Sequence, residues 1–263
     1  GPDANFLQCM KLAKGKYIWL VSDDDIVVEG GVKNVLDFLR KKNMISLVYV
    51  NTVDFRGKYI GLEKCQFHKP QPPKDIYTSS KEEFIEYAGY YWGFMSSFIC
   101  CSDMFNSIQN PEEFYNTYWL QSYIHALCAR GSHSYLGIIK EPCIGAGIYI
   151  NTSNFDSSLV NGEYYKKLLD FMISACGFKK EQMDRIFRKR FCHLCRHDIL
   201  KEKAVGVKRI NRKRMFHYSK QYPEAWLTVY PLWAIPDRIC KIVVGGVKHL
   251  RKMDRRIQVN RPE

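Results

Sequence analysis

The sequence lacks several features that would assign it at once to a large class of proteins. No apolar run approaches about 18 residues, the length at which a membrane-spanning helix becomes a candidate. The first residues show no signal-peptide pattern, and no internal repeat is visible. RNP, KH and zinc-finger signatures are also missing. These absences argue against a membrane-embedded protein, a repeat protein and the common nucleic-acid-binding modules.

Cysteine is present, but without a framework spacing. Ten cysteines are scattered singly or in close pairs through 263 residues. Disulfide-stapled domains are much shorter than this, so we expect reduced thiols in a cytosolic protein. Cys192 and Cys195, with His197 nearby, offer at most three zinc ligands and no second pair at finger spacing. We expect these two cysteines to pack on one face of a helix.

The charge is unevenly distributed along the chain. Residues 179–263 carry 23 Lys or Arg and 8 Asp or Glu, whereas residues 1–178 carry 17 and 19. Hydrophobic residues make up 46% of the sequence, which indicates a folded protein. The asymmetry predicts a near-neutral body, residues 1–150, followed by a basic, mostly helical extension, residues 151–263, that meets an anionic partner.

The most informative stretch is a hydrophobic segment that ends in adjacent carboxylates. Residues 17–21 predict a short buried parallel strand, and Asp23, Asp24 and Asp25 follow it. Parallel strands in open α/β sheets place ligands at their carboxyl ends. Neighbouring carboxylates repel one another unless a cation neutralises them, and Mg²⁺ or Mn²⁺ shared with substrate phosphates suits such oxygen ligands. The alternative is an acidic turn that caps the following helix.

Helical and strand patterns alternate along the chain, which predicts an α/β fold. We expect helices over residues 3–14, 31–40, 81–88, 112–130, 163–176, 181–200 and 236–257, and strands over residues 17–21, 45–53, 94–100 and 135–139. Residues 56–58 predict a hairpin turn, and residues 145–147 predict a further turn. The expected buried faces are Phe6, Cys9, Met10 and Ala13 in the first helix, and Val32, Val35, Leu36 and Leu39 in the second.

The order of these features resembles a known enzyme family. Gly1-Pro2-Asp3-Ala4-Asn5 leads into a helix, Ala13-Lys14-Gly15-Lys16-Tyr17 leads into the strand, and the three acids follow. This order is similar to the family 2 glycosyltransferases, especially the bacterial branch that acts on surface polysaccharides, over residues 1–147. The resemblance implies a partial GT-A (Rossmann-like) sheet. It also implies inverting transfer of a sugar from a nucleotide-sugar donor to a saccharide acceptor, which we expect to be lipid-linked.

The resemblance further implies roles for individual acids. Asp23 and Asp25 correspond to the two acids of the DxD motif, which holds Mn²⁺ or Mg²⁺ on the diphosphate of the donor. Asp24 lies between them, and we expect it to contact the substrate or to cap the next helix. Residues 94–97, Phe-Met-Ser-Ser, correspond to a family segment on the acceptor side.

The catalytic base is less well defined by the resemblance. Many family members supply it from an acidic pair that falls here at Trp119-Leu120-Gln121, where no acid is present. We expect Trp119 and Gln121 to contact the substrate. Glu113, at the start of the helix predicted over residues 112–130, is the expected base, and Glu112 and His125 are alternatives.

One departure from the family concerns the position of the acids. They lie at residue 23, whereas the family places them after three βα units. We therefore expect the chain to lack the N-terminal nucleotide-binding part and to be inactive as it stands. Its sheet would then have an exposed edge that invites pairing with another chain.

The basic extension has three interpretations. A solvated charged surface is one, and a nucleic-acid site is another, although no recognition module supports it and we expect no nucleic-acid partner. We favour an anionic membrane surface, because Trp226 and Trp233 are typical of membrane interfaces and the helix predicted over residues 236–257 has an apolar stripe flanked by cations. The expected location is cytoplasmic, peripheral on the inner face of the plasma membrane.

Two other functions stay open. A non-catalytic binding or scaffold protein would retain the fold without the acidic pair. A nucleic-acid-binding protein would rely on the basic extension, and its binding to oligonucleotides would depend steeply on salt.

Overall fold

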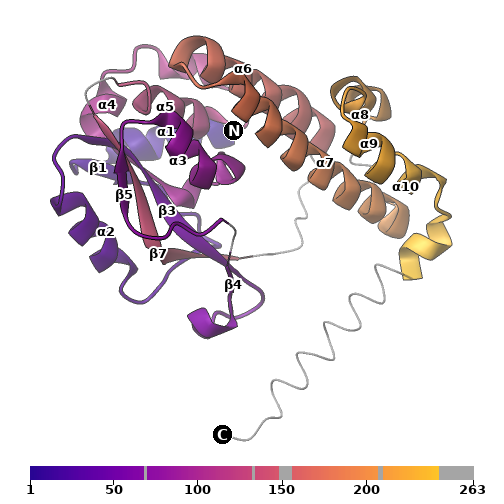
Figure 1. The fold of residues 1–263 in the computed structure, drawn as a ribbon, viewed down its shortest axis with the longest axis horizontal. Helices are drawn as coiled ribbons and strands as arrows, with labels where there is room; N and C mark the ends of the chain where they lie inside the picture. Colours follow the sequence, from indigo (N-terminus) through magenta and orange to yellow (C-terminus); the bar gives the residue numbers. More distant parts are fainter. Residues whose placement is uncertain (68–69, 132–133, 148–155, 207–209, 243–263) are drawn as a thin grey trace, which may run out of the picture. The chain divides into compact units, whose positions relative to one another are not determined.

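The computed structural model of the protein describes residues 1–67, 70–131, 134–147, 156–206 and 210–242. The chain divides into two compact units. The first comprises Gly1–Thr152 and Lys167–Ile186, and the second comprises Ser153–Lys166 and Phe187–Glu263. The first unit contains the sheet and the second is helical (Figure 1). The expected α/β class with a mostly helical C-terminal part is therefore confirmed.

The first unit is built on a seven-stranded mixed sheet. Its strands are β1 (Tyr17–Trp19), β2 (Ile26–Val27), β3 (Ile45–Phe55), β4 (Gln66–Phe67), β5 (Ile76–Thr78), β6 (Phe98–Cys101) and β7 (Tyr135–Gly147). The order is β1-β6-β3-β7-β2, with β4 paired to β3 and β5 paired to β7. β6 is antiparallel to both β1 and β3, and β3 is parallel to β7. The strands β1, β3 and β7 therefore run in one direction and end at the same edge, here called the carboxyl edge.

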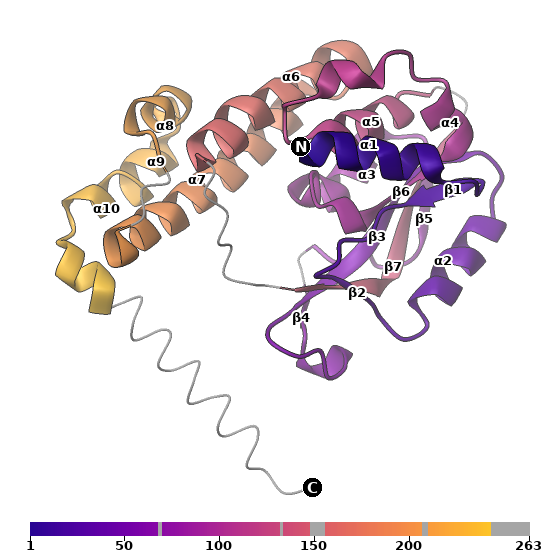
Figure 2. The same ribbon diagram turned by 180° about the vertical axis from the view of Figure 1, so that it is seen from behind.

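Helices cover both faces of this sheet. Those of the first unit are α1 (Pro2–Leu12), α2 (Gly31–Arg40), α3 (Lys81–Ala88), α4 (Ser102–Asn106) and α5 (Leu120–Cys128), with 3-10 turns at Leu62–Lys64, Gly89–Tyr91, Met95–Ser97 and Pro111–Phe114. The view from behind shows α2 on one side of the sheet, and α1, α3 and α5 on the other (Figure 2). None of the helices in the described ranges is long and apolar enough to cross a membrane.

Alternation along β3 supplies the core on each face. Val48 and Val50 join Phe38 of α2 in one buried cluster. Tyr49 points the other way and contacts Phe98, with ring centroids 5.7 Å apart. All of these side chains are buried, so the central strand is covered on both faces, as its continuous apolar run predicts.

Strand β1 is shorter and more exposed than the sequence predicts. It covers Tyr17–Trp19 rather than residues 17–21, and among its three residues Ile18 alone is buried. Its partner β6 is antiparallel, so the expected parallel pairing is wrong. β1 stands at the end of the strand order, and its other edge has no pairing partner in the part of the chain that the structure describes. A strand with one neighbour is covered less, which accounts for the exposure.

Strand β7 is longer than expected. Residues 145–147 continue the strand to Gly147 instead of forming the predicted turn. Its register with β3 shifts between Val50 and Thr52, near Pro142, which has no N–H to donate to a ladder. The irregularity absorbs the proline, so the strand can go on to the carboxyl edge. Residues 56–58 were predicted to form a hairpin turn, which would pair β3 with the residues that follow at once. The strand that pairs with the end of β3 is instead β4, at residues 66–67.

In helices α1 and α2, Met10 and Val35 are buried as predicted, but the rest of each buried face differs from the prediction. The residues buried in α1 are Asp3, Leu7 and Met10, and those buried in α2 are Gly31, Val35 and Phe38. In α2 the difference arises because the backbone of Gly31 packs directly against the backbone of β7. A Cβ atom on Gly31 would lie 2.7 Å from the carbonyl oxygen of Cys143. This contact fixes the rotation of α2 about its axis and leaves Val32 and Leu36 exposed.

The helix predicted over residues 112–130 is interrupted. A 3-10 turn covers Pro111–Phe114, and α5 begins at Leu120. Between them, Asn116 and Tyr118 have positive φ angles of 64° and 62°. The buried carboxylate of Asp3 accepts hydrogen bonds from the backbone N–H groups of Tyr118 (3.0 Å) and Leu120 (3.4 Å). The bond from Leu120 satisfies the first N–H group of α5, and the bond from Tyr118 holds the residues just before it, so the chain starts a new helix there instead of continuing one.

The second unit is helical. Its helices include the later part of α7 (Lys180–Val205), α8 (Arg212–Ser219), α9 (Pro223–Thr228) and α10 (Pro231–Ala234); residues 158–164 form a π-helix that leads into α6 (Tyr165–Cys176). Phe187 and Phe191 stack in its core, 5.1 Å apart. Cys192 and Cys195 are buried, which confirms the expectation that they pack. The helix predicted over residues 236–257 is helical at residues 237–242, and the rest lies outside the described residues.

Candidate functional site

Asp25 lies at the carboxyl edge of the sheet and is held there by two hydrogen bonds. The Ser96 hydroxyl donates to Oδ2 over 2.6 Å, and the Gly147 N–H donates to Oδ1 over 3.2 Å. Gly147 is the last residue of β7, and Ser96 lies in the 3-10 turn that leads into β6. One donor ends β7 and the other lies in the turn just before β6, and these two strands lie on either side of β3, so the sheet sets the orientation of the Asp25 carboxylate.

Ser96 organises the segment that carries the acids. It has no exposed surface. Besides donating to Asp25, its hydroxyl accepts the N–H of Ser22 over 3.0 Å. Its carbonyl accepts the indole Nε1–H of Trp19 over 2.9 Å. One buried residue therefore connects the end of β1, the turn that follows it and the carboxylate of Asp25.

The other two acids of the run are exposed. Asp23 and Asp24 form a turn before β2, and the hydroxyl of Ser22 donates a hydrogen bond to Asp24. Helix α2 begins after Gly30, with a φ of 75° and no side-chain cap. The interpretation in which Asp24 caps this helix is therefore wrong, and Asp24 remains beside Asp25 at the carboxyl edge.

A fourth acid, Asp54, was missed by the sequence analysis. It lies near the end of β3, paired with Ala146 of β7. Burial raises the pKa of Asp25, and the charges of Asp24 and Asp54 raise it further, against the hydrogen bonds from Ser96 and Gly147. Asp54 could have been found by asking which acid ends the next predicted strand. Its proximity to Asp25, however, depends on the strand order.

The acids at the carboxyl edge suit a cation that is shared with a ligand. Among the described residues, no three His, Cys, Asp or Glu side chains are grouped to hold a metal ion by themselves. Mg²⁺ usually takes one or two protein carboxylates and completes its coordination with substrate phosphates and water. The charges acting on Asp25 from Asp24 and Asp54 are negative, and each Asp25 oxygen retains acceptor capacity beyond its one hydrogen bond. The residues present therefore fit a divalent cation.

Trp119 and Gln121, which the sequence analysis placed at the substrate, lie at the start of α5. Both are buried, and the Gln121 side-chain oxygen has no hydrogen-bond partner among the described residues. The Trp119 ring packs on Gly93, where an added Cβ would lie 2.4 Å from Cζ3. Gly93 is three residues before Ser96, so one short segment connects the start of α5 to Asp25. A direct role of either side chain at a substrate stays a prediction.

The proposed catalytic bases, Glu113, Glu112 and His125, form no described hydrogen bond or ion pair with Asp25. Glu113 is exposed in the 3-10 turn before α5, and no described hydrogen bond or ion pair joins it to Asp25. Glu112 pairs with Lys11 over 2.6 Å. His125 is buried against the Phe98 ring, and burial lowers its pKa to about 3. It is therefore a neutral core residue at physiological pH. The base role of Glu113 remains a prediction.

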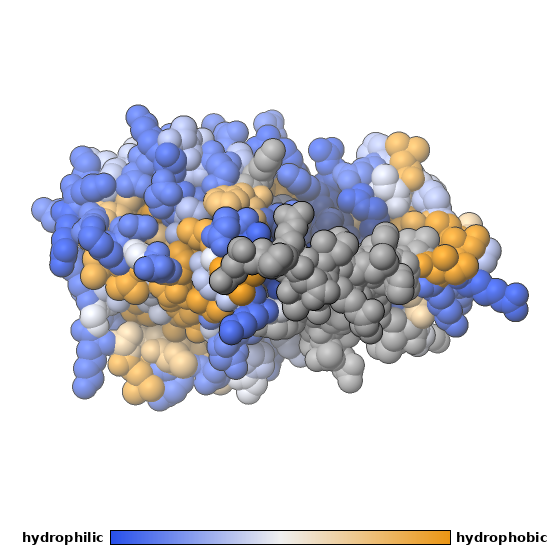
Figure 3. All heavy atoms as spheres, turned by 90° about the horizontal axis from the view of Figure 1, so that it is seen from below, coloured by the Kyte–Doolittle hydropathy of each residue, from blue (hydrophilic) through white to orange (hydrophobic). Residues whose placement is uncertain are grey.

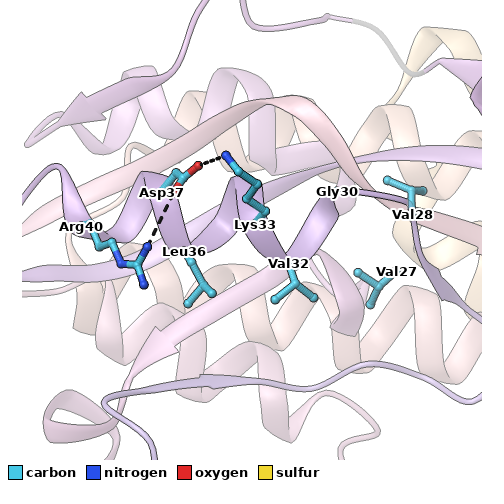
Figure 4. Close-up of a pocket in the computed structure, with 8 residues that line it drawn as sticks. All are labelled: Val27, Val28, Gly30, Val32, Lys33, Leu36, Asp37 and Arg40. Atoms are coloured by element: carbon cyan, nitrogen blue, oxygen red, sulfur yellow. Dashed lines mark hydrogen bonds and ion pairs between the residues drawn. The ribbon is translucent and has the colours of Figure 1, made fainter.

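A separate open groove lies along α2 (Figure 4). Its lining residues are Val27, Val28, Gly30, Val32, Lys33, Leu36, Asp37 and Arg40. Asp37 is engaged by Lys33 over 2.6 Å and by Arg40 over 3.7 Å. The groove is lined by apolar side chains and by the paired charges of Lys33, Asp37 and Arg40, and it contains none of the predicted site residues.

Comparison with known proteins supports the fold. No family model matches the sequence, and a search of curated proteins found no match. Among solved structures, the chain is similar to the 1–349 fragment of S. aureus TarS, a glycosyltransferase, with a TM-score of 0.50 and 12% identity over 92% of this chain and 68% of that one. The chain has a glycosyltransferase-like fold.

Two further TarS structures give similar values. The 1–349 fragment in complex with UDP-GlcNAc has a TM-score of 0.49 and 10% identity over 89% of this chain and 66% of that one. For the longer TarS structure the TM-score is 0.48 with 13% identity, over 79% of this chain and 34% of that one. This chain therefore spans about a third of the longer TarS chain.

Proposed function

We propose that the protein takes part in glycosyl transfer, moving a sugar from a nucleotide-sugar donor to a hydroxyl of a saccharide acceptor. The observation that carries the proposal is the position of Asp25, fixed by Ser96 and Gly147 at the carboxyl edge of a glycosyltransferase-like sheet. TarS structures contain UDP and UDP-GlcNAc, which suggests the donor class. The proposal includes the family 2 assignment, inverting stereochemistry and a lipid-linked acceptor.

The acids have distinct roles in this proposal. Asp23 and Asp25 would hold Mn²⁺ or Mg²⁺ on the diphosphate of the donor. A bound divalent cation supplies positive charge where the diphosphate leaves. Ser96 would keep the Asp25 carboxylate in position, and Asp24 would contact the donor from the exposed side of the turn.

The acceptor side needs a base. In inverting transfer the acceptor hydroxyl attacks the anomeric carbon, its proton passes to a carboxylate, and the bond between the sugar and the diphosphate breaks. Glu113 is the candidate from the sequence. Asp54 is the candidate from the structure, because its charge acts directly on Asp25. Trp119 and Gln121 would shape the acceptor side through the segment that begins at Gly93.

Release of UDP tests the function. The assay uses the product of the complete gene, which is incubated with UDP-GlcNAc, UDP-glucose or UDP-galactose and MnCl₂, with and without acceptor sugars. Asp25→Asn keeps the shape of the side chain and should lower the rate at least about 100-fold. Asp103→Asn, an exposed acid in α4, serves as the control and should leave the rate unchanged. An Asp25→Asn rate equal to that of the unmodified protein would refute the metal assignment.

The same assay separates the two bases and the non-catalytic alternative. If Asp54→Asn abolishes turnover and Glu113→Gln does not, the base is Asp54, and the reverse result assigns Glu113. The buried Trp119 and Gln121, which replace the expected acidic pair, favour a binding protein as the second candidate. That candidate predicts calorimetric binding of a nucleotide sugar with no UDP release.

A further inference from the structure

The second unit carries an exposed surface that the proposed function does not use. Phe216 of α8 and Trp226 and Leu227 of α9 are 44%, 53% and 77% exposed. Lys213 and Lys220 flank Phe216 on the chain, and both are exposed. These five residues are here called the aromatic–cation patch. Figure 3 shows hydrophobic side chains at the surface of this unit, at the right of the view.

The rings of the patch are fixed in place. Phe216 and Trp226 lie with ring centroids 6.0 Å apart, and Tyr230 lies 4.8 Å from Trp226 and 5.6 Å from Phe216. The Trp226 Nε1–H donates to the carbonyl oxygen of Lys220 over 2.8 Å. The Tyr230 and Ser219 hydroxyls lie 2.7 Å apart. The large apolar side chains are therefore held outward by specific contacts, which lowers the entropic cost of docking them on a partner.

The charge of the unit favours an anionic partner. Several of its acids already have cationic partners: Asp156 and Glu163 pair with Arg214, Glu224 pairs with Arg196, and Asp237 pairs with Lys203. Lys213 and Lys220 form no ion pair within the described ranges. They lie three residues before and four residues after Phe216, so all three lie on one side of α8, from its first turn to its C-cap at Lys220. Exposed cations beside exposed apolar side chains fit a surface that is negative outside and apolar beneath.

Aliphatic exposure distinguishes a lipid surface from nucleic acid. Protein surfaces that bind single-stranded nucleic acid combine basic side chains with aromatic rings that stack on the bases. An aliphatic side chain adds no stacking to such a surface. Leu227 is the most exposed apolar residue of the patch, and Ile242 and Ile239 are 73% and 49% exposed beside Arg238 and Lys241. Interfacial helices combine Trp, Phe and Leu with Lys and Arg in this way.

We infer that the aromatic–cation patch docks on an anionic lipid bilayer, with Trp226 and Leu227 in the headgroup region and Lys213 and Lys220 on lipid phosphates. The sequence analysis expected Trp226 and Trp233 in these positions. The structure assigns a different set, because the Arg212 guanidinium covers the Trp233 ring at 3.9 Å and Trp233 is only partly exposed. Phe216 and the cations of α8 replace it.

Co-sedimentation of the full chain with vesicles tests the inference. Vesicles of phosphatidylcholine alone are compared with vesicles containing about one third phosphatidylglycerol, whose negative surface attracts exposed cations. Strong binding is expected to the anionic vesicles and weak binding to the neutral ones. The double variants Trp226→Ser/Leu227→Ser and Lys213→Glu/Lys220→Glu should each weaken binding at least about tenfold.

Matched variants in the first unit serve as controls. Leu12→Ser removes an exposed apolar side chain, and Lys14→Glu/Lys58→Glu makes the same change in net charge as the patch variant. Both should bind vesicles as the unmodified protein does. Circular dichroism and thermal melts of every variant check that the fold is intact. Equal losses in the patch and control variants would show a general charge effect and overturn the inference.

Two further outcomes would also overturn it. Tighter binding to a single-stranded oligonucleotide than to anionic vesicles at the same salt, lost in the patch variants, would assign the surface to nucleic acid. Self-association that the patch variants abolish, without vesicle binding, would assign it to a second copy of the chain. UDP release in solution is independent of the patch, so failure of vesicle binding and failure of the proposed function are distinguishable.

Discussion

Ser96 donates a 2.6 Å hydrogen bond to Asp25 from a position with no exposed surface. Ser96→Ala removes this donor and also the acceptor of the Ser22 N–H. Because a buried group that loses its partner costs about 1–3 kcal/mol, the free energy of unfolding should fall by that amount. Urea unfolding followed by fluorescence measures it. UDP release should fall as well, since the Asp25 carboxylate loses one of its two positioning bonds.

The control for this variant is Ser107→Ala. Its hydroxyl donates to the carbonyl of Met104 over 2.7 Å, but the residue is exposed and water can replace the bond. The expected change in the free energy of unfolding is within about 0.5 kcal/mol. Similar losses in both variants would mean that Ser96 contributes no more than an ordinary serine, and the organising role assigned to it would be wrong.

Asp25→Asn should stabilise the protein while it removes function. The pKa of Asp25 is raised by burial, so the folded state binds this proton more tightly than the unfolded chain does. The free energy of unfolding therefore falls as pH rises through the range above the ordinary aspartate value. At pH 7.5 the variant avoids that loss, so its free energy of unfolding should exceed that of the unmodified protein, by a small margin because the side chain is only half-buried and water screens its charge.

Thermal melts at two pH values check this prediction. The difference between Asp25→Asn and the unmodified protein should be largest at pH 7.5 and should shrink at pH 4. Addition of MnCl₂ with UDP should raise the melting temperature of the unmodified protein and not that of the variant, since a ligand stabilises only a state that binds it. A variant that is destabilised at pH 7.5 would contradict the pKa argument, and one still stabilised by MnCl₂ with UDP would contradict the metal assignment.

His125 should make the stability of the protein sensitive to mild acid. Burial lowers its pKa to about 3 in the folded state, from 6.5 in the unfolded chain. Below pH 6.5 the unfolded chain therefore binds a proton that the folded state does not, and the free energy of unfolding falls as pH drops. The loss approaches about 1.4 kcal/mol per pH unit between these two values.

Urea unfolding of His125→Leu from pH 7.5 to pH 5 measures this contribution. The variant cannot bind this proton in either state. Its free energy of unfolding should therefore fall less steeply with decreasing pH than that of the unmodified protein, by the contribution of about one proton. His217→Ala changes an exposed histidine and should keep the slope of the unmodified protein. Parallel pH profiles for His125→Leu and the unmodified protein would show that His125 does not control the acid sensitivity.

Local patterns in the sequence were enough to locate the acids at the carboxyl edge. A hydrophobic strand followed by Asp23–Asp25 predicts that placement, and the structure has it. Asp54 was not found, and Ser96 was named only as part of the segment 94–97 and not as a partner of Asp25. Their proximity to Asp25 depends on the order of the strands, in which β6 lies between β1 and β3. Pairing order is a property of the whole sheet and has no local signal.

Long-range polar contacts account for the other differences. Asp3 lies at the start of the first predicted helix, yet its buried carboxylate accepts hydrogen bonds from the N–H groups of Tyr118 and Leu120, where the helix predicted over residues 112–130 is interrupted. The same contact moves Glu113 into a separate turn. No residue near Asp3 in the sequence indicates a partner more than a hundred positions away.

Gly93→Ala should disturb the start of α5 more than its size suggests. Gly93 has a φ of 109°, and an added Cβ would lie 2.4 Å from the Trp119 ring, so strain and overpacking together should cost about 2–5 kcal/mol. Gly30→Ala is the matched control, with a positive φ of 75° and no atom within 4 Å, and it should cost about 1–2 kcal/mol. Urea unfolding gives both values, and tryptophan fluorescence reports displacement of Trp119. Equal costs without a spectral change would show that Trp119 does not depend on Gly93, and the proposed connection between α5 and the Asp25 segment would fail.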